Sequence, residues 1–270
     1  MRRRLDAELV RRRLVSDPAA AQAAIGEGRV LVDGNPAAGP ATMVGTDQAV
    51  VISAPRTEAF VSRGGEKLDA AFERFSLDPK GLDALDAGAS TGGFTDCLLR
   101  RGASRVVAVD VGYGDLAWSL RTDPRVTVFE RTNVRTLDRA ALPFIPSFVV
   151  ADLSFVSLGS VVGTLAGLAC RDATFVLLVK PQFEASRDQV EAGGVVRDPR
   201  VWALALERAV DALSAAGVGP RQVWPSSVLG PAGNVEFLLW GRAGAAEGGS
   251  RIAIDEAIAA ARSLAGEPAP

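Results

Sequence analysis

DAGASTGGF, residues 86–94, is the stretch of this sequence that decides its fold. It follows the first of several apolar runs and opens a helical pattern. Its small residues allow a backbone to approach a ligand, and the N-terminus of a helix offers free N–H groups. Glycine content alone is equally typical of a tight strand-to-helix turn. Ser90 stands at the second glycine position of a G-x-G-x-x-G fingerprint, which disfavours pyrophosphate binding.

Apolar runs recur around this stretch, alternating for the most part with helical segments. We predict strands within 82–88, 105–111, 126–131, 147–153 and 174–180. This alternation is typical of a parallel, doubly wound sheet with helices on both faces. Two later runs, 221–228 and 236–242, are joined by only residues 229–235, which favours an antiparallel pair. The pattern predicts an α/β fold: a Rossmann-like class I methyltransferase sheet, mostly parallel, with an antiparallel last strand.

The first 55 residues predict a separate, small α+β domain. Leu5, Leu9, Val10 and Leu14 lie on one face of a helix, and Asp17-Pro18 begins a second helix as N-cap and first residue. Short strands follow around 29–32 and 49–52, with a turn at 33–34. We therefore expect a domain at 1–55, a linker at 56–62, a catalytic domain at 63–245, and a flexible segment followed by a helix at 246–270.

Composition excludes several classes of function. The 270 residues are 48% hydrophobic and contain no histidine, which removes histidine-based triads and histidine zinc sites. Two cysteines fit a reduced, cytoplasmic protein without a disulfide framework, and no metal site is expected. The charged start of the sequence does not predict a signal peptide, and no apolar stretch has membrane-spanning length. We therefore expect no membrane partner.

Basic residues are concentrated at the N-terminus. Residues 1–13 hold six arginines against two acidic residues, whereas the whole chain carries a net charge of −2. Such an arm suggests an anionic partner, most simply nucleic acid, although a solvated helix face explains charge alone equally well. The candidate RNA-binding residues are Arg3, Arg4, Arg11, Arg12, Arg13 and, beyond this arm, Arg63.

Four scattered charged residues are placed to meet at one edge of the predicted sheet. Asp152 and Lys180 end apolar runs, Glu236 begins one, and Lys67 lies on a helix that leads into the domain. Each alone is typical of a surface ion pair or a strand-end cap. Together, around a methyl donor, they suit methylation of a ribose hydroxyl, which requires alignment of the reactants and removal of a proton. Because histidine is absent, a neutral lysine amine is the natural base.

The cofactor site is predicted from the 86–94 stretch and from the ends of the next strands. Asp110 ends the second strand, where a carboxylate bonds ribose hydroxyls, and Asn133 follows the third, where it neighbours an adenine. The 86–95 sequence closely resembles the S-adenosylmethionine loop of FtsJ-like methyltransferases, which implies S-adenosyl-L-methionine as cofactor. The candidate cofactor-binding residues are Asp86, Gly88, Ala89, Ser90, Gly92, Gly93, Phe94, Asp110, Val111, Asn133 and Asp152.

The first 55 residues resemble the S-four-type RNA-binding domain in Arg4-Leu5-Asp6, Gly28-Arg29-Val30 and Asp33-Gly34. That family presents basic side chains from two helices to RNA. It often has serine–arginine at the start of the second helix, whereas Asp17 follows Ser16 here. The departure places more of the expected phosphate contacts on residues 11–13.

Segments spread over nearly the whole chain resemble the TlyA family: VSRGGEKL (61–68), LDAGASTGGFTD (85–96), VADLSFVSL (150–158), LVKPQFE (178–184) and GPAGNVEFLLW (230–240). That family joins an S-four-type domain to an FtsJ-like domain. It is described both as haemolysin and as a ribosomal RNA 2′-O-methyltransferase that acts on cytidines. The resemblance implies Lys180 as base, Asp152 and Glu236 as positioning groups, and Lys67 as a residue that helps to orient the target hydroxyl.

The resemblance implies ribosomal RNA, or ribosomal subunits, as partner, without deciding between the small and the large subunit. A haemolysin is the weaker alternative, since a membrane-length apolar segment and a secretion signal are both missing from the pattern. An RNA-binding module with a degenerate catalytic fold is a third reading, which the complete four-residue set disfavours. The sequence does not indicate an oligomeric state.

Overall fold

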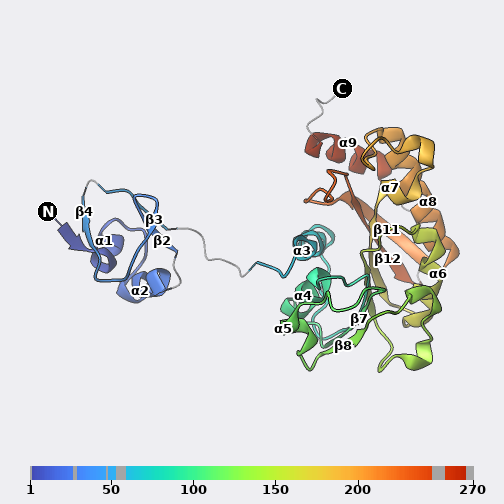
Figure 1. The fold of residues 1–270 in the computed structure, drawn as a ribbon, viewed down its shortest axis with the longest axis horizontal. Coiled ribbons are helices and arrows are strands. Elements are labelled where there is room, and N and C mark those ends of the chain that lie inside the picture. Colours follow the sequence, from blue (N-terminus) through green and yellow to red (C-terminus); the bar gives the residue numbers. More distant parts are fainter. Residues whose placement is uncertain (1, 27–28, 47, 53–58, 245–252, 266–270) are drawn as a thin grey trace. The chain divides into compact units, whose positions relative to one another are not determined.

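The computed structural model describes residues 2–26, 29–46, 48–52, 59–244 and 253–265, which belong to two compact units, 1–59 and 60–270 (Figure 1). Residues 60–62, expected in the linker, pack with the second unit. The Phe60 ring lies against Gly65, and the Val61 N–H donates to Asp96. Residues 56–58, 246–252 and 266–270 of the predicted linker and tail lie outside the described part.

The first unit has the predicted α+β composition. Asp17 caps the second helix by accepting from the Ala20 N–H, and Asp33-Gly34 forms a turn with both φ angles positive, 48° and 81°. A pair of short strands, β1 and β4, was not predicted, because three arginines carry little strand signal. The elements are β1 (Arg2–Arg4), α1 (Leu5–Arg11), α2 (Pro18–Gly26), β2 (Val30–Val32), β3 (Asn35–Pro36), β4 (Met43–Gly45) and β5 (Val50–Ile52).

The predicted apolar face of the first helix is correct for Leu5 and Leu9, which are fully buried. It is wrong for Leu14, whose residue is 41% exposed. The reason is that α1 ends at Arg11, and Arg13 takes a left-handed conformation with φ +57°. The chain has turned before Leu14 could join the buried face.

The second unit is built on a seven-stranded sheet with the order β11-β12-β10-β9-β6-β7-β8. The neighbouring strands β10, β9, β6, β7 and β8 all pair in parallel, and β12 is antiparallel to both β10 and β11. The predicted sheet with its antiparallel last strand is therefore confirmed. The strands are β6 (Asp83–Ala87), β7 (Arg105–Val109), β8 (Val126–Phe129), β9 (Phe148–Ala151), β10 (Thr174–Val179), β11 (Val218–Pro225) and β12 (Phe237–Ala243).

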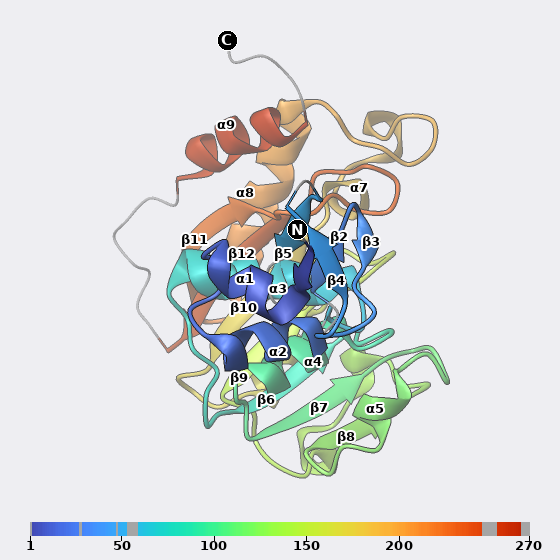
Figure 2. The same cartoon turned by 90° about the vertical axis from the view of Figure 1, so that its left-hand side faces the viewer.

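Helices cover both faces of this sheet (Figures 1 and 2). The strand side chains alternate between two apolar cores: Val106 and Val150 face one, whereas Val107 and Val149 face the other. The first core is covered by α3 (Arg63–Phe75), α4 (Gly93–Arg100) and α5 (Trp118–Arg121), and the second by α6 (Val162–Leu168), α8 (Pro199–Ala215) and α9 (Ile254–Leu264).

Aromatic contacts fix α3 against the last two strands. The Arg74 guanidinium lies 3.7 Å from the ring centroid of Trp224 on β11, and the Phe75 ring packs 6.4 Å from that of Trp240 on β12. These contacts place the end of α3 against β11 and β12, and the hydrogen bond from Lys67 to Glu236 places the start of α3 beside the start of β12. Because β12 runs antiparallel, its start lies at the edge of the sheet where β9 and β10 end.

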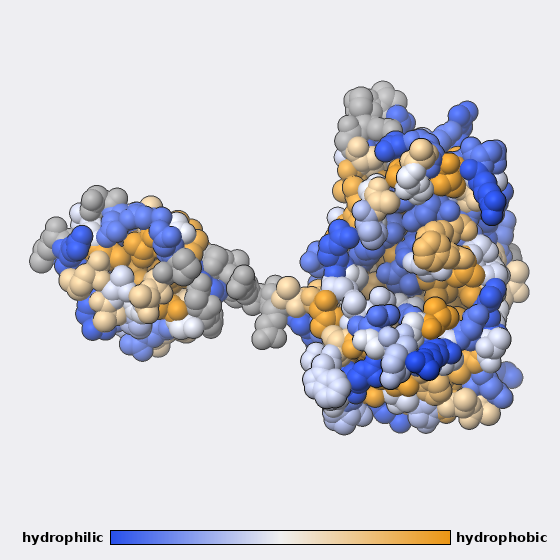
Figure 3. All heavy atoms as spheres, in the orientation of Figure 1, coloured by the Kyte–Doolittle hydropathy of each residue, from blue (hydrophilic) through white to orange (hydrophobic). Residues whose placement is uncertain are grey.

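No helix within the described ranges combines the length and apolar character needed to cross a membrane. The face of the second unit seen in Figure 3 mixes hydrophilic side chains with small hydrophobic patches.

Candidate active site

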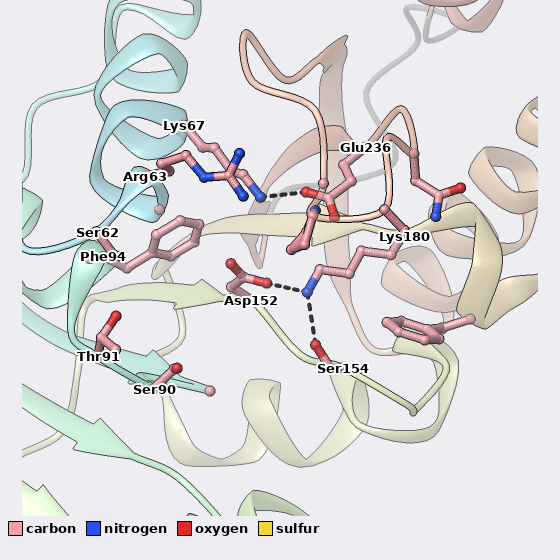
Figure 4. A pocket seen from close by; sticks show the side chains of 18 of the residues that line it. Ser62, Arg63, Lys67, Ser90, Thr91, Phe94, Asp152, Ser154, Lys180 and Glu236 are labelled. Carbon is pink, nitrogen blue, oxygen red and sulfur yellow. Dashed lines mark hydrogen bonds and ion pairs between the residues drawn. The ribbon is translucent and has the colours of Figure 1, made fainter. Parts of the chain in front are cut away.

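The four charged residues predicted to meet do meet. Lys67 from α3, Asp152 after β9, Lys180 after β10 and Glu236 before β12 line one cavity of about 530 Å³ (Figure 4). Lysine is rare here: of 30 basic residues in the sequence only three are lysine, and two of them line this cavity. Arginine stays charged, whereas a lysine amine can lose its proton. The use of lysine here therefore suits proton chemistry.

Lys180 is held by two groups from the segment that follows β9. Its Nζ lies 2.5 Å from Asp152 Oδ1, in an ion pair without hydrogen-bond geometry, and donates to Ser154 Oγ at 3.1 Å. The Lys180 side chain is only 10% exposed. Because Asp152 and Ser154 occupy two sides of the Lys180 amine, its remaining open side faces the cavity.

Lys67 and Glu236 form a second, more deeply buried pair. The Lys67 Nζ donates to Glu236 Oε2 at 2.5 Å, and the two side chains are 8% and 1% exposed. Gly230 makes room for this carboxylate, since a Cβ there would lie 2.6 Å from Glu236 Oε1. The sheet edge thus presents two lysine–carboxylate pairs side by side.

A second cavity, of about 410 Å³, adjoins the first and shares Gly88, Ser90, Asp152, Ser154 and Phe155 with it. The predicted cofactor residues Asp110, Val111 and Asn133 line this second cavity. The Asp110 carboxylate accepts two backbone N–H groups, from Ser90 at 2.8 Å and Gly112 at 2.7 Å. Carboxylate oxygens keep further acceptor capacity, so Asp110 can brace both loops and still accept a ribose hydroxyl.

The glycines of the 86–94 stretch also serve packing between elements. A Cβ on Gly88 would lie 2.5 Å from the Asp152 carbonyl oxygen, and one on Gly93 would lie 2.3 Å from Ser62 Oγ. Gly92 has φ +99° and faces Leu120 instead of the cavity. Small residues are therefore required at these positions because neighbouring segments approach them closely, whether or not a ligand does. Of the predicted cofactor residues in this stretch, Gly88, Ala89, Ser90, Gly93 and Phe94 line the first cavity.

Asp86 differs from the other predicted cofactor residues, because it is fully buried beneath the loop. Its Oδ2 accepts from Thr95 Oγ1 at 2.7 Å, and its Oδ1 has no hydrogen-bond partner. Burial raises the pKa of the Asp86 carboxyl to about 7; the Thr95 hydrogen bond opposes this rise, and the Asp152 charge adds to it. Its position suits support of the loop from below.

Several cavity residues were not predicted from the sequence. Ser154 and Phe155 follow Asp152 by two and three residues, and Gln182 and Phe183 follow Lys180 at the same spacing. The Phe155 residue is 91% exposed, and its ring centroid lies 5.1 Å from that of Phe183. Their only sequence signal was closeness to a strand end, which is shared by many residues without a role.

The predicted RNA-binding arginines fall into two groups. Arg63 lines the cavity of the second unit. In the first unit Arg4 is paired with Asp6, and both Arg11 and Arg12 donate to Glu8, which lowers the pKa of the Glu8 carboxyl to about 2. Arg3 and Arg13 are exposed and form no ion pair within the described residues.

Among the described residues, histidine, cysteine and acidic side chains form no group of three or more that could hold a metal ion.

Comparisons with known proteins agree with this geometry. The model of the FtsJ-like methyltransferase family matches residues 60–243. The 16S/23S rRNA (cytidine-2′-O)-methyltransferase TlyA of Mycobacterium tuberculosis is 52% identical over 242 residues, which cover 88% of this chain and 89% of that protein. Hemolysin A of Brachyspira hyodysenteriae is 39% identical over 180 residues, 66% of this chain and 75% of that protein. The solved structure of a provisionally named hemolysin from Streptococcus thermophilus matches with a TM-score of 0.72 and 32% identity, covering 97% of this chain and 96% of that one.

Proposed function

This chain belongs to the FtsJ-like methyltransferase family, and within it to the TlyA family, and we propose that it transfers a methyl group from S-adenosylmethionine to the ribose 2′-hydroxyl of cytidine in ribosomal RNA. The observation that carries the proposal is the pair of lysine–carboxylate contacts at one cavity, Lys180 with Asp152 and Lys67 with Glu236. The TlyA relative from Mycobacterium tuberculosis, whose name gives 16S and 23S rRNA, supports both subunits as substrates.

The second cavity fits the nucleoside part of the cofactor. It is lined by apolar Val111 and Val134, by the amide of Asn133, and by Asp110 at the strand end where ribose hydroxyls are bound. At the wall shared with the first cavity lies Asp152, next to Lys180. A cofactor lying across this wall would supply an activated methyl group beside the Lys180 amine.

The residues of the chain then supply alignment and proton removal. A neutral Lys180 amine can keep its contacts with Asp152 and Ser154 and still direct its lone pair at the ribose hydroxyl. It accepts the hydroxyl proton as the oxygen bonds to the methyl carbon and the bond from that carbon to sulfur breaks. The Lys67–Glu236 pair, which lines the same cavity beside these groups, orients the hydroxyl. The low exposure of the Lys67, Lys180 and Glu236 side chains, at most 10%, limits water at the reacting atoms.

The target nucleotide enters the first cavity by extrusion from its RNA. The exposed Phe155 ring offers a face on which an unstacked base can lie, and Arg63 offers a charge for a phosphate. The exposed arginines of the first unit would bind RNA phosphates at a second part of the chain. Localisation in the cytoplasm, where ribosomes are found, remains a prediction.

The test is transfer of tritiated methyl from S-adenosylmethionine to purified 30S and 50S subunits that lack the modification, followed by mapping of the labelled nucleotide. Lys180→Ala should lower the rate about 10²- to 10⁴-fold, the usual contribution of a positioned base. Lys80→Ala, at the one lysine outside the cavity, is the matched control and should retain the wild-type rate. Wild-type protein that labels neither subunit would refute the proposal. A Lys180→Ala variant with undiminished transfer would refute the base assignment alone.

A membrane-active function is the second candidate, because several relatives carry the name hemolysin. It can be tested separately, by release of haemoglobin from erythrocytes with the same purified protein. Lysis that survives Lys180→Ala would establish an activity independent of methyl transfer.

A further inference from the structure

The segments that follow β9 and β10 also touch outside the Lys180 contacts and the Phe155–Phe183 ring packing. Glu184 Oε1 accepts a hydrogen bond from the Leu158 backbone N–H at 2.6 Å. Leu158 begins a short 3-10 helix, Leu158–Ser160, whose first N–H groups have no partner within that helix. The Glu184 carboxylate therefore caps this turn from a neighbouring segment.

The capped segment is the one that holds the proposed base. Residues 152–157 leave β9 and belong to no helix or strand, yet they carry Asp152 and Ser154, which both contact the Lys180 Nζ. Within this segment Phe155 has φ +62°, a conformation that bulky residues rarely adopt and that the surroundings must hold in place. The segment is fixed by β9 at one end and by the Glu184–Leu158 bond at the other.

Glu184 is itself firmly placed. It ends the short helix α7 (Pro181–Glu184), whose N-cap residue is Lys180 and whose first residue, Pro181, is buried. Its backbone carbonyl accepts from the Arg208 Nη1 on α8 at 2.8 Å. Lys180, the proposed base, and Glu184, which caps Leu158, thus lie at the two ends of α7, and the Arg208 hydrogen bond anchors α7 to α8.

We propose that Glu184 is a positioning residue for methyl transfer: by holding Leu158 it keeps Asp152 and Ser154 against the Lys180 amine. This inference rests on the proposed function. Glu184 does not line the large cavity and acts through other residues, so its loss should impair the chemical step more than the binding of either substrate.

The experiment compares Glu184→Ala, Glu184→Gln and the matched control Glu207→Ala, which removes an exposed glutamate from the neighbouring helix α8. Steady-state methyl transfer to ribosomal subunits gives kcat and the KM for S-adenosylmethionine, at a temperature where circular dichroism shows every variant folded. Glu184→Ala should lower kcat about 10- to 100-fold, as displacement of a reacting group by about 1 Å does, with KM changed by less than about twofold. Glu184→Gln should stay within about threefold of wild type, because its amide oxygen can still accept the Leu158 N–H.

Each outcome tests either the positioning role of Glu184 or the proposed methyl transfer. A Glu184→Ala variant with wild-type kcat would overturn the positioning role, and so would a Glu184→Gln variant impaired as strongly as Glu184→Ala. A reduced kcat in Glu207→Ala would show that α8 responds to any lost charge, which also speaks against a specific role. Wild-type protein without methyl transfer would instead remove the proposed function on which the inference rests.

Discussion

The Lys67 Nζ and Glu236 Oε2 lie 2.5 Å apart although the two residues are separated by 169 positions in the sequence. The pair joins the first helix of the second unit to its last strand, and neither side chain is more than 8% exposed. A buried pair of this kind is costly to desolvate, and removal of one partner leaves the other charge uncompensated.

Replacing one member of this pair should therefore destabilise the second unit strongly, and replacing both should cost less than the sum of the two single replacements. We expect Lys67→Met and Glu236→Leu each to lower the free energy of unfolding by about 3 kcal/mol. The double variant buries no lone charge and should lose clearly less than the two single losses combined. Urea unfolding of the four proteins measures this coupling, and strictly additive losses would show that the two charges do not stabilise each other.

Asp110 should control cofactor affinity through both of its proposed tasks. Asp110→Ala removes the acceptor for two backbone N–H groups as well as the proposed ribose contact, so S-adenosylmethionine should bind about 10- to 100-fold more weakly. Asp110→Asn keeps one oxygen and should fall between alanine and wild type. Isothermal titration calorimetry supplies the Kd, with Asp211→Ala, an exposed aspartate on α8, as control. Unchanged affinity in Asp110→Ala would remove this residue from the cofactor site.

Asp86 should make stability depend on pH up to about 7, and above the ordinary carboxyl range the chain, lacking histidine, has few other titrating groups. Its folded-state pKa is raised from 3.8 to about 7, so between these values the folded protein keeps a proton that the unfolded chain releases. Wild-type stability should therefore fall, relative to Asp86→Asn, as pH rises from about 4 to 7, by at most about 4 kcal/mol. Denaturant unfolding of both proteins at pH 5 and pH 8 measures the difference. A gap that is the same at both pH values contradicts the prediction.

The arginines of the first unit should separate into RNA-binding and structural residues. Arg3→Ala and Arg13→Ala should weaken binding to ribosomal RNA and reduce the salt dependence of log K by about one counterion each, because both side chains are exposed and unpaired within the described residues. Arg12→Ala should instead lower the melting temperature, since Arg12 donates to Glu8 and to the carbonyl groups of Gly45 and Gln48. Filter binding at several salt concentrations and thermal melts distinguish the groups. An Arg12 variant with unaltered melting would contradict this division.

The parts of the fold that follow from periodic apolar runs could be predicted from the sequence. The seven strands of the second unit and the antiparallel end were predictable, because most buried strands require continuous apolar residues. For β11 the predicted bounds, 221–228, were wrong by three residues, since the strand begins at Val218 and includes the exposed Arg221 and Gln222. Strand β1 was not, since its three arginines are exposed and its pairing with β4 depends on a distant segment.

The same distinction holds within the site. Lys67, Asp152, Lys180 and Glu236 could be placed at one edge, because strand ends bring distant residues together. The pairing within this set could not be predicted, since Lys67 contacts Glu236 and Lys180 contacts Asp152 only once helix packing is fixed. The packing role of Gly88 and Gly93 could not be predicted either, because the sequence shows the glycine but not the neighbouring segment that approaches it.

The position of Glu236 before the last strand also bears on when the site is completed during synthesis. Translation makes Lys67 early and Glu236 after all the parallel strands, so a nascent chain can close the cofactor loop and place Lys180 while one wall of the cavity is still missing. Until β12 has left the exit tunnel and inserted between β10 and β11, Lys67 has no carboxylate partner. A protein proposed to modify ribosomal RNA thus completes its set of four charged groups only after all the parallel strands of its sheet have been made.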